Sequence, residues 1–156
     1  MDRRVWRAAA CAVAVLLTGS CGYAAAIHAA EISEGQLVGR WTSPAGTSLT
    51  FSKDHTFAGT GFDQVEALAG CGNPGALSTG RWAFYGSADG SSASRPDETV
   101  TRGHDLSLTF TDVPNCTVWV YLYGGSEDPA MCPTRDPDAG CPMGGYLKRD
   151  GDGAQP

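Results

Sequence analysis

The chain of 156 residues lacks the short motifs that mark common catalytic sites. It contains no G-x-S-x-G nucleophile turn, no H-E-x-x-H metal helix and no glycine loop that could cradle a phosphate. Histidine is scarce: after the first thirty residues only His55 and His104 remain, each beside an aspartate in a predicted hairpin turn. No serine or cysteine is spaced to serve them as a nucleophile, so both are interpreted as exposed turn residues. The sequence predicts no catalytic residue, no cofactor and a protein that is not an enzyme.

Ligand sets for a metal and positive charge for nucleic acid are also missing. The cysteines show no paired C-x-x-C spacing, which disfavours a zinc site. Asp136, Asp138 and Gly140 resemble a calcium loop, but the distal bidentate acid of an EF-hand is absent, so we interpret the segment as a solvated acidic loop. Residues 31–156 carry eight Lys and Arg against sixteen Asp and Glu. Such an acidic body repels phosphate backbones, and we predict neither a metal nor a nucleic-acid partner.

What the chain does contain is a series of short alternating segments bounded by turn residues. Residues 36–62 predict three consecutive strands, because Trp41, Leu49, Phe51 and Phe57 fall on one face of a pleated chain. Further strands are predicted over residues 77–85, 98–102, 106–111, 116–123 and 146–149. One short helix is predicted over residues 63–69, capped by Asp63. The pattern predicts an all-β fold of about seven or eight antiparallel strands, arranged as a barrel or a sandwich.

Two of these segments raise questions about their outer faces. In residues 106–111, apolar residues alternate with Ser107, Thr109 and Thr111, which predicts a strand with one buried and one solvated face. In residues 116–123, one row is small and apolar, and we expect it to face the core. The other row consists of Trp119, Tyr121 and Tyr123. That row is either covered by the loop after Cys132, which is the preferred interpretation, or exposed as a binding surface.

The first thirty residues predict an export signal. They begin with three arginines and continue without a charged residue from residue 8 to residue 30, with an apolar segment that includes Cys11 and is too short for a typical membrane span. Three fates remain open. Cys21 follows small residues, as in a lipobox, and would become the lipidated first residue of a lipoprotein, although Thr18 departs from that motif. Alternatively, cleavage after Ala26 releases a secreted protein, or the segment stays uncut as an anchor.

The remaining cysteines are even in number, which in an exported chain predicts two disulfides. Four cysteines allow three connectivities. We favour a bond between Cys132 and Cys141, because the turn-rich segment between them would close a short loop. Cys71 would then pair with Cys116.

The two ends of the chain carry a resemblance. The sequence LVGRW at residues 37–41, with Trp41 in the first strand, and a last strand ending in Lys148 and Arg149 resemble the opening and closing of lipocalin-like β-barrels. In that family the G-x-W motif marks the first strand, and a basic residue from a late strand often packs across the tryptophan. The G-R-W sequence recurs with Trp82. The layout is also similar to small actinobacterial lipoproteins of unknown function. The resemblance implies an up-and-down barrel, which we place over residues 36–149, after the signal helix. The polar residues 31–35 predict a short tether or a single helical turn, and residues 150–156 predict a disordered tail.

Two functional hypotheses follow. The first is a non-enzymatic binding domain, exported and tethered to the outer face of the cell membrane or released outside the cell. It would take a small apolar ligand into a barrel mouth lined by Trp41 and Trp82, or a protein partner on the Trp119, Tyr121 and Tyr123 row. The second is a secreted inhibitor of a protease or lysozyme that acts through the disulfide-closed loop 132–141.

Overall fold

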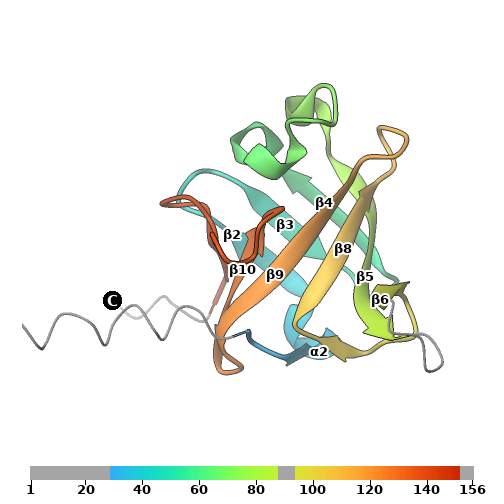
Figure 1. The fold of residues 1–156 in the computed structure, drawn as a ribbon, viewed down its shortest axis with the longest axis vertical. Helices are drawn as coiled ribbons and strands as arrows, with labels where there is room; N and C mark the ends of the chain where they lie inside the picture. The colour runs from blue at the N-terminus through green and yellow to red at the C-terminus, as the bar shows by residue number, and fades with distance from the viewer. Residues whose placement is uncertain (1–28, 88–93, 152–156) are drawn as a thin grey trace, which may run out of the picture.

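The computed structural model describes residues 29–87 and 94–151, which form a closed antiparallel β-barrel (Figure 1). Each of the eight barrel strands pairs with the next barrel strand along the chain, and the last pairs with the first, which closes the ring. The predicted all-β, up-and-down barrel is confirmed. The strands of the barrel are β2 (Gly39–Thr42), β3 (Ser48–Phe51), β4 (Thr56–Thr60), β5 (Thr79–Ser87), β8 (Asp105–Phe110), β9 (Thr117–Gly125), β10 (Asp128–Pro133) and β11 (Leu147–Arg149).

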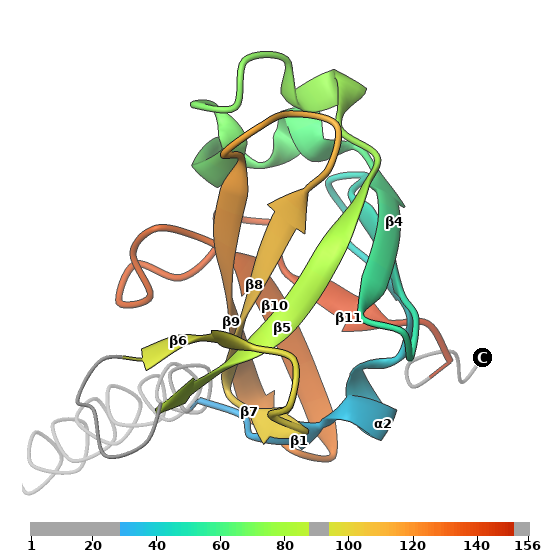
Figure 2. The ribbon, with the colours of Figure 1, turned by 90° about the vertical axis from the view of Figure 1, so that its right-hand side faces the viewer.

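One end of the barrel is closed by elements at the start of the described chain. Strand β1 (Ile32–Ser33) pairs with β7 (Arg102–Gly103), and the helical turn α2 (Glu34–Leu37) follows β1 directly, so these elements lie together at the lower end in Figure 2. The side chains of Ile32 and Leu37 are fully buried. Residues 31–35 thus lead into a helical turn, one of the two expected arrangements, and Ile32 within them is packed in the core.

The opposite end is covered by three turns of 3-10 helix, at the top of Figure 2. They are η2 (Phe62–Gln64), η3 (Glu66–Leu68) and η4 (Pro74–Ala76). The single helix predicted over residues 63–69 is thus replaced by two shorter ones. The predicted cap was also wrong, since the residue at the N-cap of η2 is Gly61, in a left-handed conformation, and not Asp63. Phe62 and Leu68 are buried in the hydrophobic core, so the apolar side chains of these turns cover this end of the barrel.

The barrel interior is filled by aromatic rings that pack edge to face. Phe51 lies 6.1 Å from Trp82, and Phe110 lies 5.2 Å from Phe57 and 4.9 Å from Phe62, all between ring centroids. Trp41 and Trp82 are buried, and each indole N–H donates to a backbone carbonyl, at Leu37 (2.8 Å) and Ser52 (3.1 Å). Edge-to-face rings with satisfied polar atoms give a solid, specific core.

The late basic residue expected from the lipocalin resemblance lies where the first strand begins. Arg149 is opposite Trp41 in the β11–β2 register, and its Nη2 donates to the Val38 carbonyl at 2.9 Å. Gly39 has a φ of 133°, and its missing side chain leaves room for the guanidinium, whose Nε would lie 3.3 Å from a β-carbon at that position. Arg149 thus ties the last strand to the entry of the first.

Two strand predictions need correction. Residues 98–102 do not form one strand: β6 (Ser94–Asp97) ends before them, and β7 begins only at Arg102. Strand β10 was not predicted, because it is acidic at its start and contains Pro129 and Pro133. Proline cannot donate to a sheet ladder, but β11 pairs with β10 only at Ala130 and Met131, so both prolines lie where β10 has a single neighbour.

Both predicted disulfides form, Cys71–Cys116 and Cys132–Cys141. The first joins the 3-10 cap to the start of β9, and the second closes the loop after β10. Residues 1–28 of the predicted export signal, Cys21 among them, and the last five residues of the tail lie outside the described residues. The last two residues of that predicted segment, Ala29 and Ala30, lie against β9, and Ala30 is buried. Among the residues that the structure describes, no helix is long and apolar enough to cross a membrane.

Candidate functional site

Three aromatic side chains stack on the outer surface of the barrel. Tyr85 of β5 and Trp119 of β9 lie 4.5 Å apart between ring centroids, at an interplanar angle of 29°. Tyr121 lies on the other side of Trp119, at 5.6 Å and 26°. We call Tyr85, Trp119 and Tyr121 the aromatic face. Trp119 is 41% exposed, and in the described part of the chain Met143 is the only other large apolar side chain that is exposed.

Strand alternation and register explain how these residues meet. On β9 the small residues Val118 and Val120 point into the core and are buried, which turns Trp119 and Tyr121 outward. Strand β8 lies between β5 and β9, with Asp105 opposite Tyr121 and Ser107 opposite Trp119. The expected small row of β9 does face the core, as predicted.

A buried carboxylate anchors the centre of the aromatic face. Asp105 is largely buried, and its Oδ2 accepts a hydrogen bond from Trp119 Nε1 at 2.9 Å. The exposed His104 places Nε2 3.5 Å from the other oxygen, Oδ1. Burial raises the pKa of both Tyr85 and Tyr121, and the nearby negative charge of Asp105 raises it further in each case. The tyrosines of the aromatic face therefore stay protonated at neutral pH and can donate hydrogen bonds.

Tyr123 does not belong to this exposed surface. It is 7% exposed, its hydroxyl donates to the Pro137 carbonyl at 2.7 Å, and its ring meets Tyr146 edge to face at 5.8 Å. Desolvation raises its pKa to about 12. The preferred interpretation, cover by the loop after Cys132, is thus confirmed for Tyr123 but wrong for Trp119.

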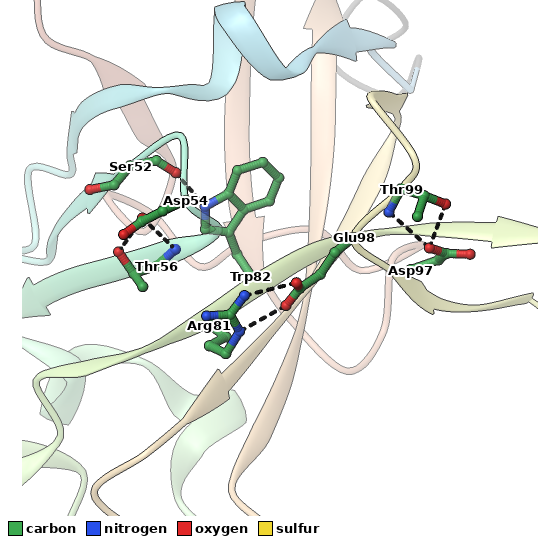
Figure 3. Close-up of polar contacts among 8 residues, drawn as sticks. All are labelled: Ser52, Asp54, Thr56, Arg81, Trp82, Asp97, Glu98 and Thr99. Atoms are coloured by element: carbon green, nitrogen blue, oxygen red, sulfur yellow. Dashed lines mark hydrogen bonds and ion pairs between the residues drawn. The ribbon is translucent and has the colours of Figure 1, made fainter.

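A groove of about 310 Å³ runs along the outer surface of β5 and β8, next to the aromatic face. One wall carries an ion pair in which Arg81 Nε and Nη2 donate to the two Glu98 carboxylate oxygens, both at 2.8 Å. Figure 3 shows these two side chains pointing toward each other, while the neighbouring Trp82 points the other way to Ser52. The groove is lined by Arg81, Ala83, Pro96, Glu98, Ser107 and Thr109, among others.

A tight turn places Glu98 opposite Arg81. The Asp97 carboxylate accepts hydrogen bonds from the backbone N–H and the hydroxyl of Thr99, at 2.8 and 2.7 Å (Figure 3). The backbone bond is the main reason that the pKa of Asp97 is lowered. The Arg81 guanidinium in turn lowers the pKa of Glu98, and Glu98 raises the pKa of Arg81, mainly through their hydrogen bond. The ion pair therefore stays fully charged at neutral pH.

Ser107 contributes a buried hydroxyl to the groove. It is 2% exposed, and its Oγ makes no hydrogen bond of good geometry to the residues that the structure describes. A longer side-chain hydrogen bond between Ser107 and the Tyr85 phenol lowers the pKa of Tyr85, against the larger effect of burial. The sequence placed Ser107 on a solvated face, which was wrong, because the aromatic face and residues 96–98 cover this part of β8. Alternation alone cannot reveal a cover that comes from other strands.

The predicted interior binding residues lie elsewhere. Trp41 and Trp82 are packed among the core rings. Trp82 is also among the residues that line the groove, whereas Trp41, Phe51 and Phe110 line neither of the two cavities. The larger cavity, about 640 Å³, lies between the 3-10 cap and the loop after β10. Arg135 crosses between these two elements, with Nε donating to the Ala67 carbonyl at 3.2 Å. Ligand entry between the core rings would require them to separate, so the barrel mouth is not the favoured site.

The two histidines occupy different surroundings. His104 is exposed, as predicted. His55 is not, because its ring stacks on Trp82 at 4.4 Å and its Nδ1 is buried without a hydrogen-bond partner in the described chain. Within residues 29–87 and 94–151, no group of three or more His, Cys, Asp or Glu side chains could hold a metal ion.

Comparison with protein-family models, with curated proteins and with solved structures finds no match to this chain.

Proposed function

We propose that this chain is a non-enzymatic binding domain of the cell envelope and that it holds its partner on the aromatic face of β5 and β9. The main support is the stack of Tyr85, Trp119 and Tyr121, with Trp119 41% exposed on an otherwise polar surface. Exposed, pre-ordered aromatic residues contribute a large share of the binding energy at interfaces, because they bury much area at little cost in side-chain entropy. The hydrogen bond from Trp119 to Asp105 fixes the indole before any partner arrives.

The partner surface differs from the first expectation. It contains Trp119 and Tyr121, as expected, and also Tyr85 of β5. It does not contain Tyr123, because the loop after Cys132 covers that side chain. A small apolar ligand inside the barrel is disfavoured by the edge-to-face packing of the core rings.

The export and membrane tether belong to the same proposal and are tested by intact mass. Protein purified from its own membranes should begin at Cys21 and carry a diacylglycerol adduct. Its mass should also be four hydrogens below that of the reduced chain, because two disulfides form. A chain that starts at Met1 without an adduct would contradict the lipid tether, and one that starts at residue 27 would indicate secretion.

Binding is tested with isolated cell envelopes. The full chain, Trp119→Ala and the matched control Met143→Ala are incubated with washed envelopes of the producing organism, and the bound fraction is measured. Met143 is also an exposed large apolar side chain but lies outside the aromatic face. We expect Trp119→Ala to bind at least tenfold more weakly, as for a central aromatic contact. Equal binding by all three proteins would overturn the proposal.

Inhibition through loop 132–141 has weaker support. The loop is closed by a disulfide and residues 135–139 are exposed, but hydrogen bonds tie it to the rest of the protein. The Tyr123 hydroxyl donates to the Pro137 carbonyl of the loop. Arg135 of the loop donates to the Ala67 carbonyl of the 3-10 cap. A Cys132→Ala/Cys141→Ala variant that loses inhibition of a protease or lysozyme shown by the parent chain would favour this alternative.

A further inference from the structure

The aromatic face lies in a region of negative charge. Asp105 is at its centre and is 7% exposed, and its Oδ2 accepts the hydrogen bond from Trp119 Nε1 at 2.9 Å. Among the residues that the structure describes, no lysine or arginine forms an ion pair with Asp105, and its contact with the exposed His104 is long, at 3.5 Å. A carboxylate without a matching cation makes the potential of the surrounding surface negative.

The loop after β10 brings two further carboxylates to the Tyr121 side of the aromatic face. The Thr134 N–H donates to the Trp119 carbonyl at 3.1 Å, so the start of this loop runs beside β9. Asp136 and Asp138 follow, and both are exposed. Burial is the main reason that the pKa of Tyr121 is raised, and the negative charges of Asp136 and Asp138 add to it. The Tyr121 hydroxyl therefore lies within the electric field of an acidic loop.

Positive charge near this surface is paired or directed elsewhere. Arg81 in the groove is paired with Glu98 through two hydrogen bonds of 2.8 Å. Arg135 donates Nε to the Ala67 carbonyl of the 3-10 cap. Among the described residues, the charged side chains that shift the pKa of the two tyrosines of the aromatic face are all aspartates. The surface therefore attracts cations and repels anions.

We infer that the aromatic face binds an arginine side chain of a basic protein segment, with the guanidinium between Tyr121 and the carboxylates of Asp136 and Asp138. This inference rests on the proposed function and names the chemistry of its partner.

The stack itself favours arginine. Tyr85 and Tyr121 cover the two faces of the Trp119 ring, so a cation must contact the tyrosines and not the indole face. Tyr121 is only partly buried, which leaves part of its ring and its hydroxyl accessible. A planar guanidinium can stack on a tyrosine ring and donate hydrogen bonds to carboxylates in its own plane at the same time, which an ammonium cannot do. The exposed part of Trp119 can then pack against the aliphatic stem of the arginine.

Other ligand classes fit this surface less well. A phosphate or an acidic lipid headgroup would be repelled by the three aspartates. A bound metal ion would need converging ligands, and the described part of the chain has no group of three or more His, Cys, Asp or Glu side chains that could hold one. A polyamine would gain the charge attraction without the stacking.

The test measures binding of fluorescein-labelled hexa-arginine and hexalysine to the full chain by fluorescence anisotropy at physiological salt. The loop variant Asp136→Asn/Asp138→Asn removes both loop charges, and asparagine can still accept the backbone hydrogen bonds that Asp136 Oδ1 accepts from Asp138 and Ala139. Glu66→Gln/Glu127→Gln is the matched control. It changes the net charge equally at two exposed glutamates, one in η3 and one in the turn between β9 and β10.

We expect saturable binding of hexa-arginine, weakened at least about fivefold in the loop variant and less than about twofold in the control. Hexalysine should bind the parent chain at least about threefold more weakly than hexa-arginine. Tyr121→Leu gives a second measurement, because it removes the ring and keeps an apolar side chain, and it should weaken hexa-arginine more than hexalysine. Absence of hexa-arginine binding, equal weakening in the loop variant and the control, or equal affinity for the two peptides would overturn the inference.

Envelope binding separates this inference from the proposed function. Loss of envelope binding in the loop variant but not in its control would support the inference. If envelope binding requires Trp119 but is the same in the parent and the loop variant, the partner on the aromatic face is not a basic segment, so the inference falls and the proposed function stands. If Trp119→Ala binds envelopes as well as the parent does, the proposed function falls, and the inference falls with it.

Discussion

The inner and outer faces of strands β5, β8 and β9 both carry a tryptophan among other aromatic rings, but the two tryptophans differ in packing and in exposure. Inside, Trp82 is fully packed by perpendicular rings and its N–H is bound to a backbone carbonyl. Outside, Trp119 is stacked between two rings at small interplanar angles and remains 41% exposed. The fully packed inner face supplies stability, whereas the partly exposed outer face can also bind a partner.

The largest expected effect separates these two tryptophans. Trp82→Ala should lower the free energy of unfolding by about 3–5 kcal/mol, because it leaves a cavity within a rigid aromatic core. Trp119→Ala should lower it by only about 1–2 kcal/mol, through lost stacking and the lost bond to Asp105. Urea unfolding followed by far-UV circular dichroism measures both. Equal losses would mean that the outer aromatic face is a structural element and not a reserved binding surface.

The two disulfides should also contribute unequally to the free energy of unfolding. In the chain-entropy description, removing Cys71–Cys116, with a sequence separation of 45, should cost about 4 kcal/mol. Removing Cys132–Cys141, with a separation of 9, should cost about 2.7 kcal/mol. Paired Cys→Ala variants and urea unfolding give the comparison. A larger loss from the shorter loop would show that the cover over Tyr123 contributes more to stability than the tie between cap and barrel.

The stability of the protein at alkaline pH tests the burial of Tyr123, the covered residue of the outer row on β9. Desolvation raises its pKa in the folded protein to about 12, from the ordinary tyrosine value of 10.0, so the folded state holds this proton more tightly than the unfolded state. Stability should be unaffected by this group below pH 10 and should fall as the pH rises from 10 toward 12. Tyr123→Phe should lose about 1 kcal/mol at neutral pH, with the bond to Pro137, and should show a shallower alkaline loss. An unchanged alkaline slope in the variant would contradict the assignment.

The smallest expected effect concerns an exposed carboxylate at the rim. Asp112 accepts hydrogen bonds from the backbone N–H groups of Thr79 and Ser78, and these lower its pKa below the ordinary aspartate value of 3.8. Its contribution should be present above pH 3.8 and should disappear as the pH falls through the lower, folded-state pKa. The parent chain should therefore be slightly more stable than Asp112→Asn at pH 7, and the difference should vanish in acid. A difference that persists at pH 2 would exclude ionisation as its cause.

Local patterns in the sequence determined most of the barrel. Alternation placed Trp41, Leu49, Phe51 and Phe57 in the core, and the turn-rich spacing between Cys132 and Cys141 led to both disulfide pairs. These features depend on the period of a strand and on short loops, which are local properties. Strand β10 escaped detection because its prolines are tolerated only where β11 stops, and that limit belongs to the assembled sheet.

The candidate site was decided by the tertiary structure. Tyr85 and Trp119 are 34 positions apart in the sequence and meet only because β8 brings β5 and β9 into register. Ser107 looks solvated in its own strand, and residues of neighbouring strands and of the turn after β6 bury it. A sequence determines which face of a strand is apolar, but what covers the other face depends on neighbours that are distant along the chain, and on this outer face they leave the Trp119 indole partly exposed.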